Sequence, residues 1–286
     1  MNFKLLLQHF TRELSGLYDH EEAAAILNIV TRQVSGFDRG KLLLKSSESV
    51  PEGDLTLFNS FLTELKTGKP VQYVLGETVF YGLPFKVSPS VLIPRPETEE
   101  LVEWVLDTVD VTGMSGLQIL DVGTGSGCIA VCLKKNLGAA GVFALDVSKD
   151  CLLIAATNAT LNEADIIFIE ADIRNYSDAR KFDVIVSNPP YITMDEKQAM
   201  HENVLTHEPH LALFVSNEDP LVFYRAVADF ALSNLSSEGL LFFEINEYLG
   251  KETLKMLHDK SFIDTELRKD MQGKDRMIRC RLKASE

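Results

Sequence analysis

The spacing of hydrophobic residues divides the chain into a helical first part and an alternating second part. Over residues 1–70, apolar side chains recur every three or four positions, which is the spacing of one buried helix face. Asp19 and Asp54 each precede such a run, and we expect each to cap a helix. The pattern therefore predicts a small helical bundle at the N-terminus.

From residue 117 onward, short apolar runs alternate with helical segments. This alternation is typical of a parallel sheet with right-handed crossovers. The predicted strands are 117–122, 141–146, 166–170, 182–187 and 239–245, followed by two last strands at 263–267 and 277–282.

Between these two parts, residues 78–81 and 85–87 are typical of a β-hairpin, and a helix over 97–107 starts after two prolines. The pattern predicts an α/β fold with an N-terminal helical bundle and a hairpin linker. We place the boundaries at 1–72 for the bundle, 73–94 for the linker and 95–286 for the α/β domain. A chain of 286 residues accommodates such a pair of domains.

The amino-acid composition and the N-terminal residues limit which partners and which cellular compartment we expect for this protein. The formal net charge is −14, which argues against a nucleic-acid substrate and favours a basic protein surface. The first residues do not form a signal-peptide core and no apolar run is long enough to span a membrane, so a cytoplasmic location is expected. No histidine or second cysteine pair completes a metal set, so the cysteines are interpreted as core residues and no metal is predicted: Cys128, Cys132, Cys151 and Cys280.

A glycine-rich loop follows the strand at 117–122 and precedes a helix over 128–136. Its glycines allow the backbone to approach a ligand closely and expose the amides of the helix N-terminus. The spacing is G-x-G-x-G, which differs from the dinucleotide-binding pattern. Asp146 ends the next strand, where an acid would accept an adenosine ribose. The loop residues are Gly123, Thr124, Gly125, Ser126 and Gly127.

The strand at 182–187 ends in Asn188-Pro189-Pro190-Tyr191. Two consecutive prolines have no N–H to donate and so end the sheet pairing. The motif therefore places an amide, two carbonyls and an aromatic ring at the carboxyl end of a strand, where open α/β sheets bind ligands.

These motifs together resemble the class I S-adenosylmethionine (SAM) methyltransferases. The Asn-Pro-Pro-Tyr variant resembles enzymes that methylate a planar amide or exocyclic amine nitrogen. Three further segments are similar to the peptide-chain release factor glutamine N5-methyltransferases, so that the resemblance covers nearly the whole chain: 73–76 (Tyr-Val-Leu-Gly), 80–82 (Phe-Tyr-Gly) and 91–99 (Val-Leu-Ile-Pro-Arg-Pro-Glu-Thr-Glu).

The resemblance implies a seven-stranded sheet whose last strand is reversed, and SAM as the cofactor with S-adenosylhomocysteine as the product. It implies that the glycine loop passes along the methionine part and that Asp146 accepts the ribose hydroxyls. Asp172 would read the adenine amino group and Ile173 would lie against the ring. Arg95 and Glu97 either touch the ligands or only start a helix well.

For the substrate, the resemblance implies the glutamine of the Gly-Gly-Gln loop of class-1 release factors, recognised by the N-terminal bundle of a monomeric enzyme. The Asn188 side-chain oxygen and the Pro189 carbonyl would accept the two amide N–H bonds, Pro190 would contact the substrate, and Tyr191 would stack on the amide plane.

The chain departs from the family at His207, in His-Glu-Pro where Tyr-Glu-Pro is expected, and at Asn246, in place of a glycine. We expect His207 on the surface beside the site. Three alternatives stay open. They are glutamine methylation of a large-subunit ribosomal protein, methylation of an exocyclic amine in DNA or RNA, and a methyltransferase fold kept as a binding module.

Overall fold

A computed structural model describes residues 1–112 and 116–282, and the chain forms two compact units. The N-terminal unit consists of Met1–Glu77 together with His201–His207. The sheet unit consists of Thr78–Met200 and Glu208–Glu286. The chain therefore passes from one unit to the other three times. The predicted domain boundaries at residues 72 and 94 stay a prediction.

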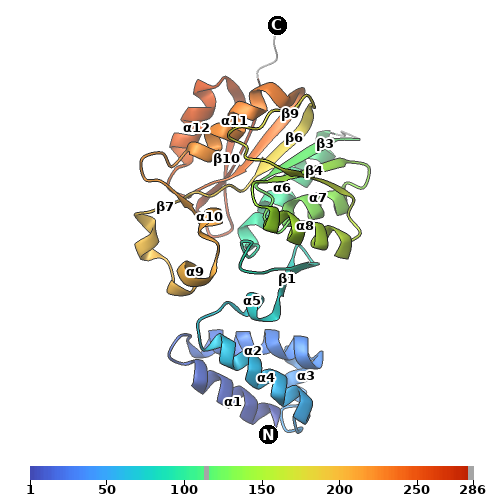
Figure 1. Cartoon of the computed structure of the whole chain (residues 1–286), viewed down its shortest axis with the longest axis vertical. Helices are drawn as coiled ribbons and strands as arrows, with labels where there is room; N and C mark the ends of the chain where they lie inside the picture. The colour runs from blue at the N-terminus through green and yellow to red at the C-terminus, as the bar shows by residue number, and fades with distance from the viewer. Residues whose placement is uncertain (113–115, 283–286) are drawn as a thin grey trace. The chain divides into compact units, whose positions relative to one another are not determined.

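The N-terminal unit is helical, as predicted, and its helices enclose an apolar core that includes Phe10, Leu27 and Phe58 (Figure 1). Asp19 caps α2, because its carboxylate accepts a hydrogen bond from the Glu22 amide at 2.8 Å. The helices of residues 1–77 are α1 (Phe3–Leu14), α2 (His20–Ser35), α3 (Arg39–Leu44), α4 (Glu52–Leu65) and α5 (Val71–Leu75).

The prediction that Asp54 caps a helix is wrong. Helix α4 already begins at Glu52, after Pro51, whose extended ψ of 146° leads the chain into the first turn. Asp54 lies within that turn, and its carboxylate instead accepts a hydrogen bond from the Ser35 hydroxyl at 2.9 Å.

A short helix from the second half of the chain completes the N-terminal unit. This is α9 (Glu202–His207), which packs with residues of the first helices and their connections. Asn203 Nδ2 donates to the Tyr18 hydroxyl at 3.3 Å, and His207 Nε2 lies 3.3 Å from the Thr67 carbonyl oxygen. His207 thus belongs to the N-terminal unit.

The sheet unit is built on a seven-stranded sheet in the order β10-β11-β9-β6-β3-β4-β5. In this sheet β11 alone runs opposite to the other six strands, so the predicted α/β class and reversed last strand are confirmed. The strands are β3 (Gln118–Val122), β4 (Gly141–Asp146), β5 (Ile166–Glu170), β6 (Phe182–Ser187), β9 (Leu235–Glu244), β10 (Phe262–Lys269) and β11 (Asp275–Leu282).

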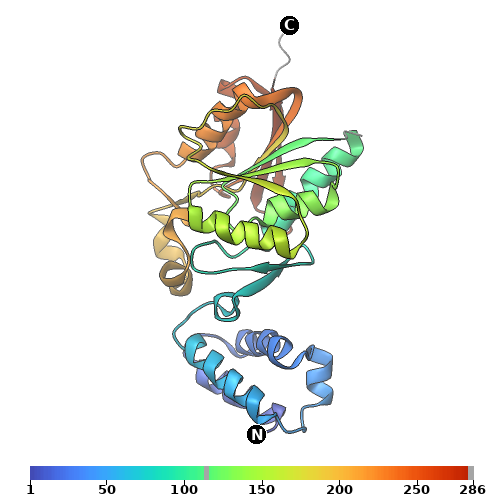
Figure 2. The same cartoon turned by 45° about the vertical axis from the view of Figure 1, so that its right-hand side comes forward.

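Helices cover both faces of this sheet (Figures 1 and 2). Successive strand residues point to opposite faces, so Ile119 packs with the cluster on one side and Leu120 with the cluster on the other. Helices α6 (Pro96–Thr112), α7 (Cys128–Asn136) and α8 (Lys149–Leu161) lie on the first side, and α11 (Val222–Asn234) and α12 (Gly250–Asp259) on the second.

Short elements frame the carboxyl edge of the sheet. The predicted hairpin is present, with a two-residue turn in which Tyr81 and Gly82 have φ of 49° and 75°. It precedes α6, which starts at Pro96 as the prolines predict. The remaining elements are β1 (Glu77–Phe80), β2 (Leu83–Lys86), β7 (Ile192–Thr193), the 3-10 helix η1 (Glu196–Ala199), α10 (His210–Leu213) and β8 (Phe214–Val215).

Asn158 of α8 ties the hairpin to the glycine loop. Its fully buried side chain accepts from the Lys86 amide at 2.6 Å and donates to the carbonyls of Lys86 and Ser126, each at 2.9 Å. Each such hydrogen bond stabilises the fold by about 1 kcal/mol, so Asn158→Ala should lower the free energy of unfolding by about 3 kcal/mol in urea titrations.

The matched control is Thr157→Ala, which truncates the exposed neighbouring side chain on the same helix. We expect a change within about 0.5 kcal/mol for this variant. Equal losses of stability in the two variants would contradict the assigned role of Asn158.

Candidate active site

A cavity of about 400 Å³ lies at the carboxyl ends of the central strands. Val122, the last residue of β3, pairs with Leu145 of β4 on one side and with Ser187 of β6 on the other. The segments that follow these three strands therefore start side by side. Chain connectivity reverses direction at β3, and such switch points are where open α/β sheets bind ligands.

The glycine loop forms one wall of this cavity. Gly123 and Gly125 have φ of 74° and 54°, and a Cβ added to either would meet no atom within 4 Å. Side chains there would project into open space beside the backbone, which is the cradle that a closely bound ligand requires. Thr124 and Ser126 also line the cavity.

Gly127 has a different position from the rest of the loop. It is the N-cap of α7 and is not part of the cavity wall. A Cβ at Gly127 would lie 3.0 Å from the Cβ of Ala155 in α8. The structure therefore gives Gly127 a role in the close packing of α7 against α8.

Asp146 is buried at the end of β4 and faces the cavity. Its two oxygens accept hydrogen bonds from the amides of Ser148 and Gly125, both at 2.9 Å. Burial raises the pKa of Asp146, and these amide hydrogen bonds oppose the rise. Each oxygen keeps further lone pairs, so the carboxylate can also accept two ligand hydroxyls.

Asp172 and Ile173 line the cavity beyond β5, as the resemblance implies. Asp172 forms an ion pair with Arg174, whose Nη2 lies 2.6 Å from Oδ2. The hydrogen bond from Arg174 lowers the pKa of Asp172, against the effect of its burial. The Asp172 carboxylate that lines the cavity is therefore already paired with the Arg174 guanidinium.

Asn188, Pro189 and Pro190 form the opposite wall, at the end of β6. Asn188 Nδ2 donates to the hydroxyl of Thr98 at 3.1 Å. Within residues 1–112 and 116–282, the structure shows no hydrogen-bond donor on either Asn188 Oδ1 or the Pro189 carbonyl. Both residues line the cavity, so these two oxygens are the candidate acceptors for a ligand.

Tyr191 is not part of the cavity wall. Its hydroxyl donates to Oε1 of the buried Glu244 at 3.1 Å, and its ring packs with the cluster on the α11 side of the sheet. Burial raises the pKa of Tyr191, and the charge of Glu244 adds to the rise. The structure places the Tyr191 hydroxyl on Glu244, and the stacking of its ring on a substrate amide stays a prediction.

Besides Arg95, for which ligand contact was left open, the wall contains residues that were not predicted from the sequence. Arg95 lines the cavity and forms a 2.6 Å ion pair with the buried Glu208, whereas Glu97 does not line it. The His-Glu-Pro stretch, which resembles the Tyr-Glu-Pro of the family, was the sequence signal for the segment that contains Glu208. The unpredicted wall residues include Ser90, Leu92, Thr98, Leu211, Ala212, Phe223 and Val227.

The cavity fits the cofactor that the sequence implies. The open space beside Gly123 and Gly125 can take the methionine part, and Asp146 is placed to accept two hydroxyls of a ribose. Among the described residues, no cluster of His, Cys, Asp or Glu is arranged to hold a metal ion.

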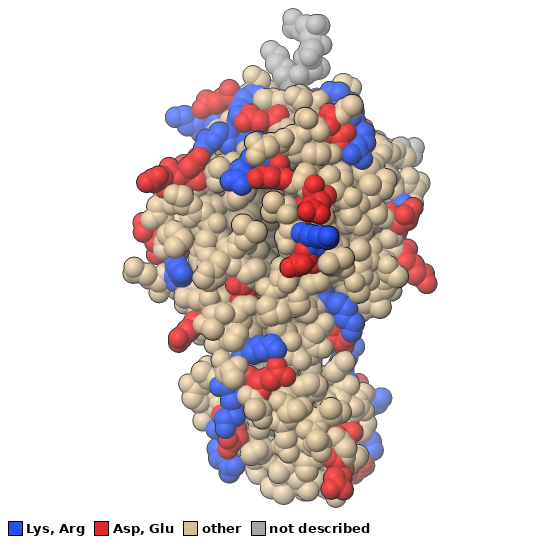
Figure 3. Space-filling view, viewed as in Figure 1, with Lys and Arg blue, Asp and Glu red and all other residues tan. Residues whose placement is uncertain are grey.

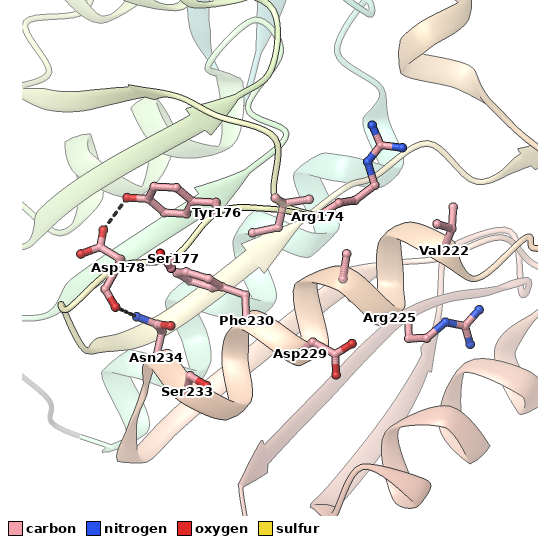
Figure 4. Close-up of a pocket in the computed structure, with 12 residues that line it drawn as sticks. Arg174, Tyr176, Ser177, Asp178, Val222, Arg225, Asp229, Phe230, Ser233 and Asn234 are labelled. Carbon is pink, nitrogen blue, oxygen red and sulfur yellow. Dashed lines mark hydrogen bonds between the residues drawn. The ribbon is translucent and has the colours of Figure 1, made fainter.

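A second hollow, of about 520 Å³, lies between the segment after β5 and α11 (Figure 4). The Asp178 carbonyl accepts a hydrogen bond from Asn234 there, at 2.9 Å. The charged residues of its wall all have partners, so we assign no chemistry to this hollow; the pairs are Arg174 with Asp172, Asp178 with Arg180, Arg225 with Asp219 and Asp229 with Lys260.

The sheet order, the single reversed strand and the cavity at the switch point are those of the class I methyltransferases. Two solved structures share the fold. The hMettl16 catalytic domain in complex with a MAT2A 3′UTR hairpin aligns with a TM-score of 0.55 at 15% identity, covering 72% of this chain and 77% of that one. The Thermus thermophilus 16S rRNA N2 G1207 methyltransferase aligns with a TM-score of 0.54 at 19% identity, and the alignment covers 72% of this chain and 50% of that one.

Relatives with higher sequence identity show which methyltransferase family this chain belongs to. A release factor glutamine methyltransferase of Flavobacterium psychrophilum is 48% identical over 94% of this chain and 95% of its own length. The Bacteroides thetaiotaomicron enzyme of this name is 38% identical over 94% of this chain and 96% of its own length. The Bacillus subtilis enzyme is also 38% identical, over 90% of each chain. Residues 6–76 match the PrmC N-terminal domain, and residues 102–213 match the methyltransferase small domain. The chain belongs to the release factor glutamine methyltransferase family.

The surface charges and the lengths of the helices concern two further expectations, on nucleic-acid binding and on membrane-spanning segments. Acidic and basic side chains are interspersed over the face drawn in Figure 3, without a continuous basic patch on that face. Among the described residues, no helix is both long and apolar enough to cross a lipid bilayer.

Proposed function

We propose that this protein transfers a methyl group from SAM to the side-chain amide nitrogen of the glutamine in the Gly-Gly-Gln loop of class-1 release factors. The observation that carries the proposal is the pair of acceptors, Asn188 Oδ1 and the Pro189 carbonyl, on the wall of a cavity that also contains the glycine loop and Asp146. A primary amide has two N–H bonds to match these two acceptors.

The proposed cofactor site is the glycine loop with Asp146, Asp172 and Ile173. The amides and open backbone of the loop would hold the methionine part, and the Asp146 carboxylate would accept the ribose hydroxyls. SAM supplies a methyl group on sulfonium sulfur: the carbon–sulfur bond breaks with its electron pair staying on sulfur, a carbon–nitrogen bond forms, and the nitrogen releases a proton to water.

Asn188 and Pro189 would act by position and charge. An amide nitrogen is a weak nucleophile because its lone pair is delocalised into the carbonyl. Two fixed acceptors orient the nitrogen for in-line attack, and they stabilise the positive charge that develops on it. Pro190 would contact the substrate from the same wall, and Tyr191 would act through Glu244, as a positioning residue.

The partner and its recognition form part of the same proposal. The relatives are named for release factors, and the match of residues 6–76 to the N-terminal domain of this family supports a recognition role for the N-terminal unit. A formal charge of −14 is compatible with a basic protein partner and unfavourable for direct binding to nucleic acid. The enzyme would act as a monomer in the cytoplasm.

The test is to incubate the protein with methyl-labelled SAM and a purified release factor, and to map the label by mass spectrometry. We expect the label on the Gly-Gly-Gln glutamine, and none on a release factor in which that glutamine is replaced by glutamate, because a carboxylate has no N–H to donate.

Three other acceptors serve as controls in the same assay: a large-subunit ribosomal protein, duplex DNA and ribosomal RNA. Label on the ribosomal protein in place of the release factor would show that the enzyme methylates a glutamine of that ribosomal protein instead. Label on nucleic acid alone would contradict the proposed function.

A further inference from the structure

A buried network lies behind Asn188, contributed by two elements far apart in the sequence. Thr98 is in the first turn of α6 and Glu244 is the last residue of β9, with exposed fractions of 3% and 1%. The Thr98 hydroxyl lies 2.7 Å from Glu244 Oε2 and 3.1 Å from Asn188 Nδ2. Neither Thr98 nor Glu244 was identified from the sequence.

The direction of these hydrogen bonds follows from proton counting. A carboxylate only accepts hydrogen bonds, so the single hydroxyl proton of Thr98 is committed to Glu244. The oxygen of Thr98 then has only lone pairs to offer Asn188, and the amide must turn its NH₂ group toward Thr98.

The groups around Glu244 support this direction, because both of its oxygens accept a hydrogen bond. Burial raises the pKa of Glu244, but the Thr98 hydrogen bond and the positive charge of Arg276 oppose that rise. The Tyr191 hydroxyl donates to the other oxygen of the same carboxylate. Two donors and one nearby cation therefore offset part of the cost of burying this carboxylate, and the net pKa of Glu244 stays raised.

We propose that Thr98 and Glu244 are positioning residues that fix the orientation of the Asn188 amide, with Oδ1 as the acceptor that faces the substrate. The two orientations of an amide differ by a half-turn and have nearly the same shape, so packing alone selects between them weakly. With the network intact, the site accepts an N–H₂ group. With the amide reversed, two NH₂ groups would face each other. This inference rests on the proposed function.

The first test compares Thr98→Val with Thr98→Ser in the full-length protein. Valine keeps the shape of threonine and removes the hydroxyl, whereas serine keeps the hydroxyl. For Thr98→Val we expect kcat for release-factor methylation to fall at least about tenfold, with the Kd for SAM unchanged. Thr98→Ser should remain within about threefold of the wild type. If valine is not tolerated in folding, Thr98→Ala makes the same comparison.

The second test is a double-mutant cycle with Asn188→Ala, which separates positioning from a general structural role. If Thr98 acts through Asn188, Thr98→Val should lower kcat no further when Asn188 is already alanine. An equal fall of kcat in both backgrounds would overturn the proposal, as would full turnover by Thr98→Val. Failure of the wild-type protein to methylate the release-factor glutamine would instead overturn the proposed function.

Discussion

Replacing Asn188 by alanine should lower kcat for release-factor methylation about a hundredfold or more, while the affinity for SAM stays the same. The lost acceptor acts most strongly when the nitrogen gains positive charge, so turnover should fall more than substrate binding. The magnitude follows the loss of one preorganised polar contact in other active sites. Single-turnover kinetics with a purified release factor, together with calorimetry for SAM, measure both quantities.

Two variants complete this comparison. Asn217→Ala truncates an exposed asparagine outside the cavity wall and should leave kcat unchanged. Asn188→Asp keeps an acceptor but places a carboxylate against the Thr98 oxygen, which has no proton to offer it. We expect this variant to bind SAM and to be severely impaired in turnover.

Near-normal methylation by Asn188→Ala would show that the end of β6 is not the site of catalysis.

Replacing Asp146 by alanine should weaken SAM binding at least tenfold in calorimetric titrations. A hydrogen bond to a charged acceptor contributes about 1.5–3 kcal/mol, and a tenfold change in affinity corresponds to about 1.4 kcal/mol. The variant also removes the acceptor for the Gly125 amide, so the glycine loop loses a support in the same step.

The matched control is Asp165→Ala, which removes the same charge from an exposed position just before β5, at the opposite end of the neighbouring strand. Its affinity for SAM should match that of the wild type. Unchanged SAM affinity in a folded Asp146→Ala variant would remove Asp146 from the proposed cofactor site.

The central part of the sheet was predictable because its strands are largely buried on both faces. Ile119 and Leu120 are adjacent in the sequence and buried on opposite sides, which produces a continuous apolar run that ends where the loop begins. Strand β9 starts at Leu235, before the predicted residue 239, because residues 236–238 are polar although they extend the strand. Helices α3 and α5 are too short to show a helical period.

The candidate site was predictable where its residues end or directly follow a strand. Gly123 and Asn188 directly follow β3 and β6, Asp146 is the last residue of β4, and strand ends converge in a parallel sheet. The contacts of Thr98 and Glu244 join residues 146 positions apart, and no local pattern reports such a pairing. Tyr191 shows the same limit, since its hydroxyl bonds to Glu244, a residue 53 positions away in the sequence.

The three passages of the chain between its two units have a topological consequence. Because α9 packs with Tyr18 and Thr67, cutting the backbone after Glu77 would separate α1 to α5 from α9, which belongs to the same unit. The severed fragment would lack its last helix, and that helix would stay covalently attached to the sheet unit at both ends. The N-terminal unit is therefore interleaved with the sheet unit along the chain, and a gene fusion that joined two self-sufficient domains end to end would not reproduce this arrangement.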